Sequence, residues 1–150
     1  MRTNFYRNKK LDQEFRNQSY TDPATWYLAL LSAASATGGT EVTGTGIARA
    51  TLACSLTNWS GTQGAGTTAA SSGTSGIITP NVEIQFAAAG ATTAAVSAAF
   101  IGFFDAASAG NLCRYYPILD GAGNPITRTW AIGERIFIDD AAPTLSIQMT

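Results

Sequence analysis

The stretch that decides the fold is WYLALL, residues 26–31, a run of six residues without a charged side chain. It lies between the turn signal Thr21-Asp22-Pro23 and the pair Gly38-Gly39. A short apolar run bounded by Pro and Gly is typical of a strand that is buried on both faces. A helix is the competing interpretation, because Leu and Ala favour helices.

Downstream of this run, apolar residues recur at every second position, which is the period of a strand. The alternation is clear in Leu52–Leu56, Val82–Phe86 and Leu145–Met149. Further short apolar segments are Val96–Phe104, Leu112–Leu119, Ile126–Trp130 and Arg135–Ile138, the last two separated by a Gly133-Glu134 turn. About eight short strands, with Gly, Pro, Asn and Asp between them, predict an all-β fold, an antiparallel β-sandwich of the jelly-roll type.

The N-terminus differs from the rest of the chain in charge and pattern. The chain has 150 residues and a net charge of -1, yet five of its nine basic residues lie in the first sixteen positions. A helix is predicted over Lys10–Asn17, where Leu11 and Phe15 share one face, but two apolar residues cannot hold it alone. We therefore expect a partly helical arm at residues 1–20, lying on its own domain or on a neighbouring subunit, and a β-sandwich domain at residues 21–150.

A long polar segment interrupts the predicted strands at about residues 59–76. After Trp59 it contains no charge and no apolar side chain larger than that of alanine. A mobile surface loop is one interpretation, because Gly-rich and Ser-rich segments are flexible. The other is that the loop lies on a partner and becomes ordered there, because a loop of this length is unusual in a compact domain.

The composition excludes the common forms of catalytic and metal-binding chemistry. Without histidine, neither a Ser-His-Asp triad nor a Cys-His pair can form. Cys54 and Cys113 are too few for a zinc site; each is expected to fill a small buried space, although a bridge between them stays open. Asp139-Asp140 are interpreted as turn residues leading to Pro143 rather than as a general acid and base. We expect no catalytic residue, no metal site and no cofactor.

Two Gly-rich motifs resemble nucleotide-binding sequences only in part. Gly44–Arg49 (GTGIAR) has Arg49 at the third glycine position of a dinucleotide fingerprint, and Gly64–Ala69 lies in the polar loop rather than between a strand and a helix. Nucleic acid is not the expected partner, because the chain is acidic overall. No membrane span is expected, because no apolar stretch approaches 18 residues.

The arm is the predicted partner-binding region, because Arg and aromatic residues are enriched at protein interfaces. The residues expected to contact a partner are Arg2, Phe5, Tyr6, Arg7, Lys9, Lys10, Phe15 and Arg16. Core packing is expected for Trp26 and Trp130. Trp59, next to Asn58 and the polar loop, is the tryptophan that we expect to be exposed and available for contact.

Three segments in this order resemble a family of small virion structural proteins of tailed bacteriophages: residues 21–31 (TDPATWYLALL), 38–49 (GGTEVTGTGIAR) and 102–112 (GFFDAASAGNL). Residues 131–138 and 145–147 are similar to the closing hairpin of that family. The sequence departs from the family at Ile47, where an aromatic residue is usual, and in the length of the 59–76 loop.

The resemblance implies a virion protein that assembles in the bacterial host cytoplasm as a homo-oligomer or symmetric array. Within the particle, we expect a capsid cement or decoration protein, whose arm and 59–76 loop cross the joints between major capsid protein subunits and stabilise the shell. A tail, collar or fibre-associated protein is the first alternative. The second is a carbohydrate-binding module for host recognition, in which Trp26, Trp59 and Trp130 stack on sugars. An enzyme is not expected.

Overall fold

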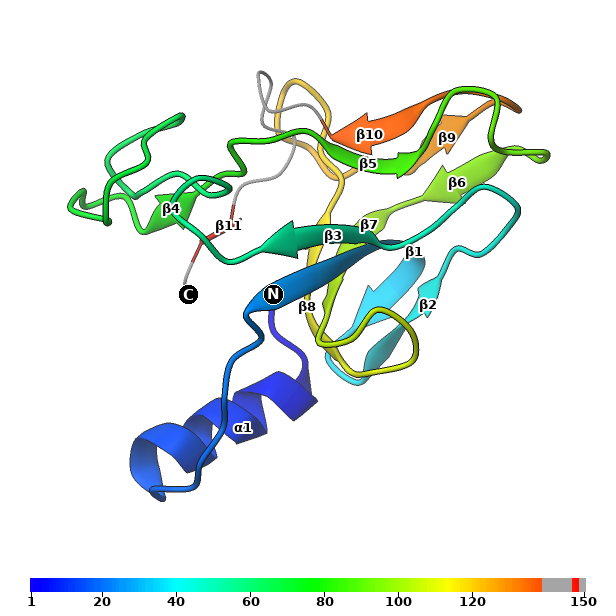
Figure 1. Cartoon of the computed structure of the whole chain (residues 1–150). Coiled ribbons are helices and arrows are strands. Elements are labelled where there is room, and N and C mark those ends of the chain that lie inside the picture. The colour runs from blue at the N-terminus through cyan, green and yellow to red at the C-terminus, as the bar shows by residue number, and fades with distance from the viewer. Residues whose placement is uncertain (139–146, 149–150) are drawn as a thin grey trace.

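The computed structural model describes residues 1–138 and 147–148, which form one helix and eleven strands. The helix is α1 (Asn4–Phe15). The strands are β1 (Thr25–Ser35), β2 (Gly38–Glu41), β3 (Ala50–Ala53), β4 (Ile77–Ile78), β5 (Ile84–Ala87), β6 (Val96–Ala98), β7 (Phe100–Phe104), β8 (Leu112–Pro117), β9 (Arg128–Trp130), β10 (Ile136–Ile138) and β11 (Ile147–Gln148). Their pairings are antiparallel, so the predicted all-β antiparallel fold with a short helical arm is confirmed (Figure 1).

The largest sheet is built around β1, which is the strand predicted from WYLALL. Its order is β2-β1-β7-β8, and β3 also pairs with β1. β1 pairs with β7 along one edge. It has 11 residues, so its other edge is long enough to pair with two short strands, first β3 and then β2. The smaller sheets are β5 with β10, β6 with β9, and β4 with β11.

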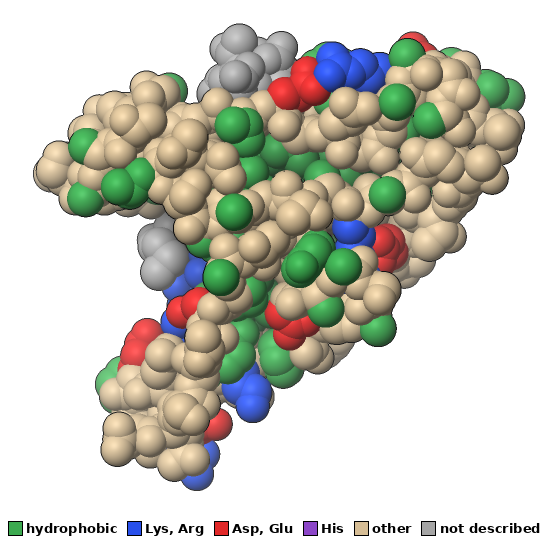
Figure 2. Space-filling view, viewed as in Figure 1, with side chains coloured by type: hydrophobic (Ala, Val, Ile, Leu, Met, Phe, Trp, Pro, Cys, Tyr) green, Lys and Arg blue, Asp and Glu red, His purple; other side chains and the backbone are tan. Residues whose placement is uncertain are grey.

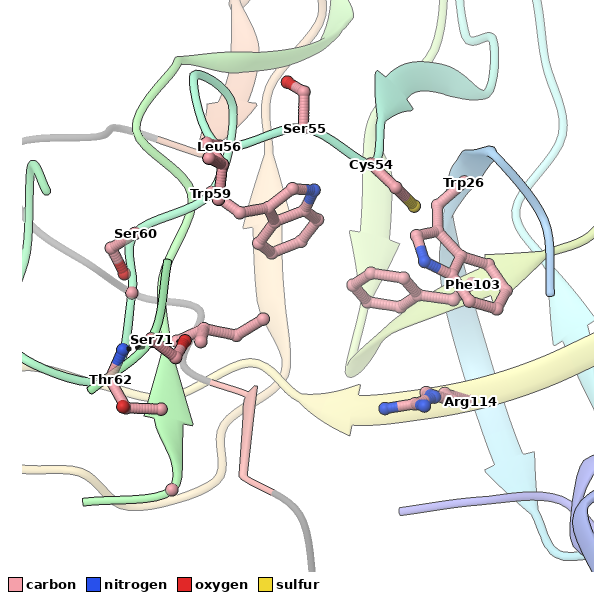
Figure 3. Close-up of a pocket in the computed structure, with 13 residues that line it drawn as sticks. Trp26, Cys54, Ser55, Leu56, Trp59, Ser60, Thr62, Ser71, Phe103 and Arg114 are labelled. Carbon is pink, nitrogen blue, oxygen red and sulfur yellow. Dashed lines mark hydrogen bonds between the residues drawn. The ribbon is translucent and has the colours of Figure 1, made fainter. Parts of the chain in front are cut away.

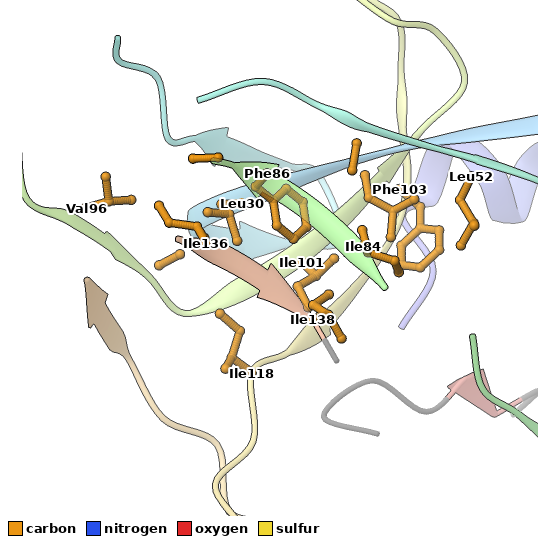
Figure 4. Packing of buried hydrophobic residues seen from close by; sticks show 14 of the residues in the cluster. Leu30, Leu52, Ile84, Phe86, Val96, Ile101, Phe103, Ile118, Ile136 and Ile138 are labelled. Atoms are coloured by element: carbon orange, nitrogen blue, oxygen red, sulfur yellow. The ribbon is translucent and has the colours of Figure 1, made fainter. Parts of the chain in front are cut away.

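Side chains of β1 point alternately to the two faces of this sheet, as in any strand. Leu28 and Leu30 enter the main core, which lies between the large sheet and the strands β5, β6, β9 and β10 (Figure 4). Ala29 and Leu31 enter a second cluster with Phe104 on the other face. Both faces are therefore covered, which explains why the run lacks polar positions.

Two predicted strands are shorter or divided in the structure. The alternation at Leu52–Leu56 predicted a strand, but β3 ends at Ala53 and Leu56 is exposed. Val96–Phe104 is divided at Ala99, whose N–H donates to the Leu31 carbonyl at 2.9 Å. The chain changes sheets at this point, because β6 pairs with β9 whereas β7 pairs with β1.

The helix begins earlier than predicted. It spans Asn4–Phe15 rather than Lys10–Asn17, because Thr3 caps its N-terminus: the Thr3 side chain accepts from the Tyr6 N–H at 3.4 Å. Leu11 and Phe15, on which the prediction rested, are 52% and 77% exposed. Their shared face therefore points to solvent and not to the sheet.

The C-terminal part differs from the expected closing hairpin. The strands on either side of the Gly133 turn do not pair with each other, because β9 pairs with β6 and β10 with β5. Of the predicted strand Leu145–Met149, the structure describes Ile147–Gln148, which pair with β4. Asp139-Asp140 lie outside the described residues.

Candidate functional site

The arm is attached to the edge of the large sheet by backbone hydrogen bonds. The Thr3 N–H donates to the Cys113 carbonyl at 3.0 Å, and the Tyr115 N–H donates to the Met1 carbonyl at 2.9 Å. The Thr3 hydroxyl adds a bond of 2.6 Å to the Leu112 carbonyl. Residues 1–3 therefore continue the sheet beyond β8 and fix the position at which α1 begins.

Tyr6 anchors the helix to its own domain. It is 1% exposed, and its ring packs edge-on against Tyr20 and Trp26 at centroid distances of 6.0 and 6.2 Å. Its hydroxyl donates to Asp22 Oδ1 at 2.8 Å and accepts from Arg114 Nη2 at 3.0 Å. Tyr6 was expected to contact a partner; that expectation is wrong for the docked arm, because the sandwich buries the side chain.

The remaining predicted arm residues divide by exposure. Arg7, Lys9, Phe15 and Arg16 are exposed, whereas Arg2, Phe5 and Lys10 are half-buried. With 3.6 residues per turn, Leu11 and Phe15 lie one turn apart on the side of the helix opposite Tyr6. The helix therefore has one face held by the domain and one apolar face exposed to solvent. Figure 2 shows the arm projecting from the body, with charged side chains around it.

The Asp22 carboxylate connects the helix to the start of β1. It forms an ion pair with Lys10 and accepts from the Tyr6 hydroxyl. Burial acts to raise the pKa of Asp22, but the hydrogen bonds from Lys10 and Tyr6 outweigh it and hold that pKa below its usual range. The stabilisation is therefore present above about pH 4 and is lost as the pH falls through the lowered folded-state pKa.

We expect Asp22→Asn to lower the free energy of unfolding by less than about 1 kcal/mol near neutral pH, because the ion pair is half exposed. The difference from wild type should shrink as the pH falls below about 4, because protonation of Asp22 removes the charge that distinguishes it from asparagine. Urea denaturation at a series of pH values from about 7 down to about 2 measures this. Asp12→Asn is the matched control, since Asp12 also pairs with an arm cation, Arg16, but not with Tyr6. A difference that persists unchanged in acid would contradict the role assigned to the Asp22 charge.

A pocket of about 630 Å³ lies beside the attached arm, between β1, β7, β8 and the segment 54–62. Its aromatic side chains are Trp26, Trp59 and Phe103 (Figure 3). Phe103 lies between the two indoles: its centroid is 6.0 Å from Trp26, edge-on, and 6.3 Å from Trp59, tilted by 35°. The prediction that Trp59 is exposed is wrong, because only 8% of this residue is accessible.

Trp26 is half-buried and touches both the pocket and Tyr6 of the arm. Trp130 is buried in the main core, as expected, and lies outside this pocket. Two of the three tryptophans therefore share one site, which sequence spacing does not reveal because they lie 33 positions apart.

The polar loop at 59–76 is held together by its own side chains. The Gly61 N–H donates to the Thr67 hydroxyl at 2.8 Å, and the Ser75 hydroxyl donates to the Thr62 carbonyl at 2.8 Å. Asn81 joins from outside, donating to the Thr67 carbonyl at 3.0 Å. Several polar groups of the loop therefore have hydrogen-bond partners within the chain.

The two cysteines do not form a bridge. Cys113 is buried as expected, but Cys54 is exposed and lines the pocket. Burial raises the pKa of the Cys113 thiol to about 12, so this thiol is protonated at neutral pH. In the part of the chain that the structure describes, no cluster of three His, Cys, Asp or Glu side chains could hold a metal ion. No helix among the described residues is long and apolar enough to cross a membrane.

Arg49 joins two of the motifs described above, a role that sequence reasoning missed. Its Nη2 pairs with Glu41 Oε2 at 2.7 Å, and its Nη1 donates to the carbonyls of Ala106 and Ala109 at 2.7 and 2.8 Å. The guanidinium also lies 3.7 Å from the centre of the Phe104 ring. Arg49, which stands at the third glycine position of the dinucleotide pattern, therefore holds the loop after β7 in place.

The sequence matches the family model Gp80, described as podophage GP4 fiber I protein gp80, over residues 2–122. The matched region includes the arm, the large sheet, the pocket and the Arg49 clamp. A search of the curated proteins found no match.

Proposed function

Because the chain belongs to the Gp80 family of podophage fibre proteins, we propose that it is a fibre-associated virion component that attaches through the exposed face of α1. Membership of this family makes the protein a structural part of a tailed-phage virion, where it meets other virion proteins. Its position in the particle and the attaching face are our proposal.

The family description supports the fibre alternative better than the capsid cement role that we expected from the sequence. We propose a mechanical function without catalysis in either position. The absence of histidine from the chain and the protonated Cys113 thiol support this proposal.

The observation that carries the proposal is the exposed apolar pair Leu11 and Phe15 on a helix whose opposite face is already docked. Phe15 is 77% exposed, the most exposed of the large hydrophobic residues in the described part of the chain. Aromatic side chains at the centre of an interface contribute much of its binding energy. Charges of both signs surround this pair, because Arg7 and Glu14 are exposed on α1 and the C-cap residue Arg16 pairs with Asp12. An apolar groove with a polar rim is therefore the complementary surface.

We expect the double variant Leu11→Ser, Phe15→Ser to fold normally but to be lost from virions. The free energy of unfolding should change by less than about 0.5 kcal/mol, because neither side chain packs on the domain. Quantitative mass spectrometry of purified particles, against the major capsid protein, measures incorporation. The matched control is Ile132→Ser, an apolar residue that is 66% exposed and far from the arm in sequence. Normal incorporation of the double variant would contradict attachment through this face.

The same measurement on wild-type particles tests the position in the virion. A copy number that corresponds to one ring or a few fibres supports the fibre proposal. A copy number near parity with the major capsid protein, or a simple lattice fraction of it, would contradict that proposal. It would support the capsid cement role instead.

A further inference from the structure

The arm occupies a place on the sandwich that every copy of this chain carries. The Asn4 N–H donates to the Ala36 carbonyl at 2.7 Å, next to the bonds that join the N-terminus to β8. Arg114 of β8 donates to the Tyr6 hydroxyl at 3.0 Å. We call β8, together with Ala36 at the end of β1, the arm seat. Because the seat belongs to the sandwich, an identical arm from a second copy can make the same contacts.

The segment that follows α1 makes no hydrogen bond to the sandwich in the described part of the chain. Residues 16–19 are all exposed. Their hydrogen bonds stay within the arm: the Gln18 N–H donates to the Asp12 carbonyl at 3.1 Å, and the Arg16 side chain donates to the Asp12 carboxylate at 2.8 Å. Residues 16–19 can therefore extend as a hinge without breaking a hydrogen bond to the domain.

The reversal of the chain after α1 depends on the backbone of Asn17. Its φ is +52°, and among the non-glycine residues that the structure describes only Asn17 and Ala109 have a positive φ. The chain turns at this point and runs back beside α1 to β1 (Figure 1). The left-handed conformation is unfavourable for residues other than glycine, although asparagine tolerates it better than most. A short hinge under such strain favours exchange of the segment before it between copies.

The charge of the chain favours a second copy as the acceptor of a released arm. Residues 1–16 contain five basic and two acidic side chains, whereas residues 17–150 contain four basic and eight acidic ones. The arm is therefore positive, and the remainder of every copy is negative. Opposite charges steer two surfaces towards each other, so an arm that leaves its own sandwich is attracted to that of a neighbouring copy.

We propose that copies of this chain exchange their arms, so that residues 1–15 of one copy occupy the arm seat of the next and residues 16–19 span the two. Asp22 follows the hinge and stays with its own sandwich, where it meets the Tyr6 hydroxyl of the incoming arm. The closed and the exchanged forms contain the same contacts between arm and seat. The balance between them is therefore set by the hinge and by the chain concentration. Reciprocal exchange gives a closed dimer, and exchange in one direction gives a ring.

The test is photo-crosslinking of the full chain with benzoylphenylalanine in place of Phe5, which lines one cavity with Gly38 and Leu112 beside the seat. Equal amounts of unlabelled and ¹⁵N-labelled chains are unfolded together, refolded over an about hundredfold range of concentration, and irradiated. Mass spectrometry identifies the cross-links in which arm and seat carry different labels. Complete exchange makes about half of the cross-links mixed, because each arm meets either label with equal chance. Arms seated on their own copy give no mixed cross-links.

Variants of Asn17 change the balance between the closed and the exchanged form. Without such a variant, we expect the mixed share to rise with concentration towards about half, because exchange needs two copies. Asn17→Pro should reach this share at every concentration, because proline cannot adopt a positive φ and the closed turn is lost. Asn17→Gly is the matched variant that favours the turn, so its mixed share should be severalfold lower than without it.

Two controls keep the result interpretable. Benzoylphenylalanine in place of Phe15, which is 77% exposed, reports random collisions and should give no cross-link to β8. Circular dichroism shows whether Asn17→Pro folds; if it does not, Asn17→Val takes its place, because a β-branched residue also disfavours a positive φ. The absence of mixed cross-links at the highest concentration of the chain with Asn17, or equal shares in Asn17→Pro and Asn17→Gly, would overturn the proposal.

This inference is independent of the attachment proposed for α1, and the two can fail separately. The Leu11 and Phe15 variant should exchange arms as the unchanged chain does, because neither side chain contacts the seat. Asn17→Gly keeps both of these side chains exposed, so it should still be incorporated into virions.

Discussion

Replacing Arg49 by alanine is expected to lower the free energy of unfolding by about 3–5 kcal/mol, because it leaves Glu41 without its partner in a largely buried pair. The Arg49 side chain is only 9% exposed. It pairs with the Glu41 carboxylate through Nε and Nη2, and its Nη1 holds the carbonyls of Ala106 and Ala109. The variant therefore loses an ion pair and the clamp on one loop together. Urea denaturation, followed by tryptophan fluorescence, measures the loss.

The matched control is Arg135→Ala, which removes another arginine from an ion pair, the one with Glu83. Both of its side chains are substantially exposed, at 42% and 33%, so the expected loss is below about 1 kcal/mol. Arg49→Lys should recover only part of the stability, because an ammonium cannot reproduce the forked contact to a carboxylate and two carbonyls. Equal losses in Arg49→Ala and Arg135→Ala would show that the clamp contributes no more than a surface pair.

Replacing Gly46 by alanine is expected to lower the free energy of unfolding by about 3 kcal/mol, because the backbone at this position does not accommodate a side chain. Gly46 has a φ of +81°, in the left-handed region that side chains other than glycine rarely adopt. A Cβ atom built there would lie 2.1 Å from the carbonyl oxygen of Ala91, so the backbone of one of the two turns must move. Thermal denaturation followed by circular dichroism measures the loss.

Gly44→Ala is the control, two residues earlier in the same motif. Its φ lies outside the left-handed region, and its Cβ would meet only the Ile47 side chain, at 3.5 Å, an ordinary contact. We expect Gly44→Ala to change the free energy of unfolding by no more than about 0.5 kcal/mol. If both variants were equally stable, the close approach of the 43–48 turn to Ala91 would not constrain the sequence. A large loss of stability only in Gly46→Ala would show that packing requires this glycine. Nucleotide binding would then not be needed to explain it.

The strands could be predicted where burial repeats along the chain. WYLALL is apolar on both faces because both faces of β1 are covered, and the alternation at Val82–Phe86 predicts β5 in the same way. The division at Ala99 could not be predicted, because neighbouring residues there join different sheets. The sequence of that segment is apolar apart from Ser97, and no turn residue at Ala99 marks the change of partner.

The arm could be predicted from charge and composition, but not the direction in which its residues face. Tyr6 and Phe15 are both aromatic residues among basic neighbours, yet one is buried and the other exposed. The difference depends on Asp22 and Arg114, which are distant in sequence and meet the Tyr6 hydroxyl only in the folded chain. Thr3 was a local signal that the helix starts early, because threonine is a preferred capping residue.

The aromatic pocket could not be located from the sequence. Trp59 follows a polar segment and precedes another, which is typical of an exposed residue, but in the fold it packs against Phe103 of β7. Long-range packing of this kind leaves no trace in the neighbouring residues. The interpretation of Arg49 failed for the same reason, since its contacts to Ala106 and Ala109 span almost 60 positions.

The place of β1 in the sheet determines how the domain responds to tension. The arm leads directly into Thr25, at the start of a strand that is paired along both edges. Once the arm is detached from β8, a pull on it acts along the axis of β1 and shears its ladders with β3 and β7. Hydrogen bonds loaded in this direction share the force and break together rather than one after another. The domain therefore opposes a pull through its arm with the combined strength of two ladders.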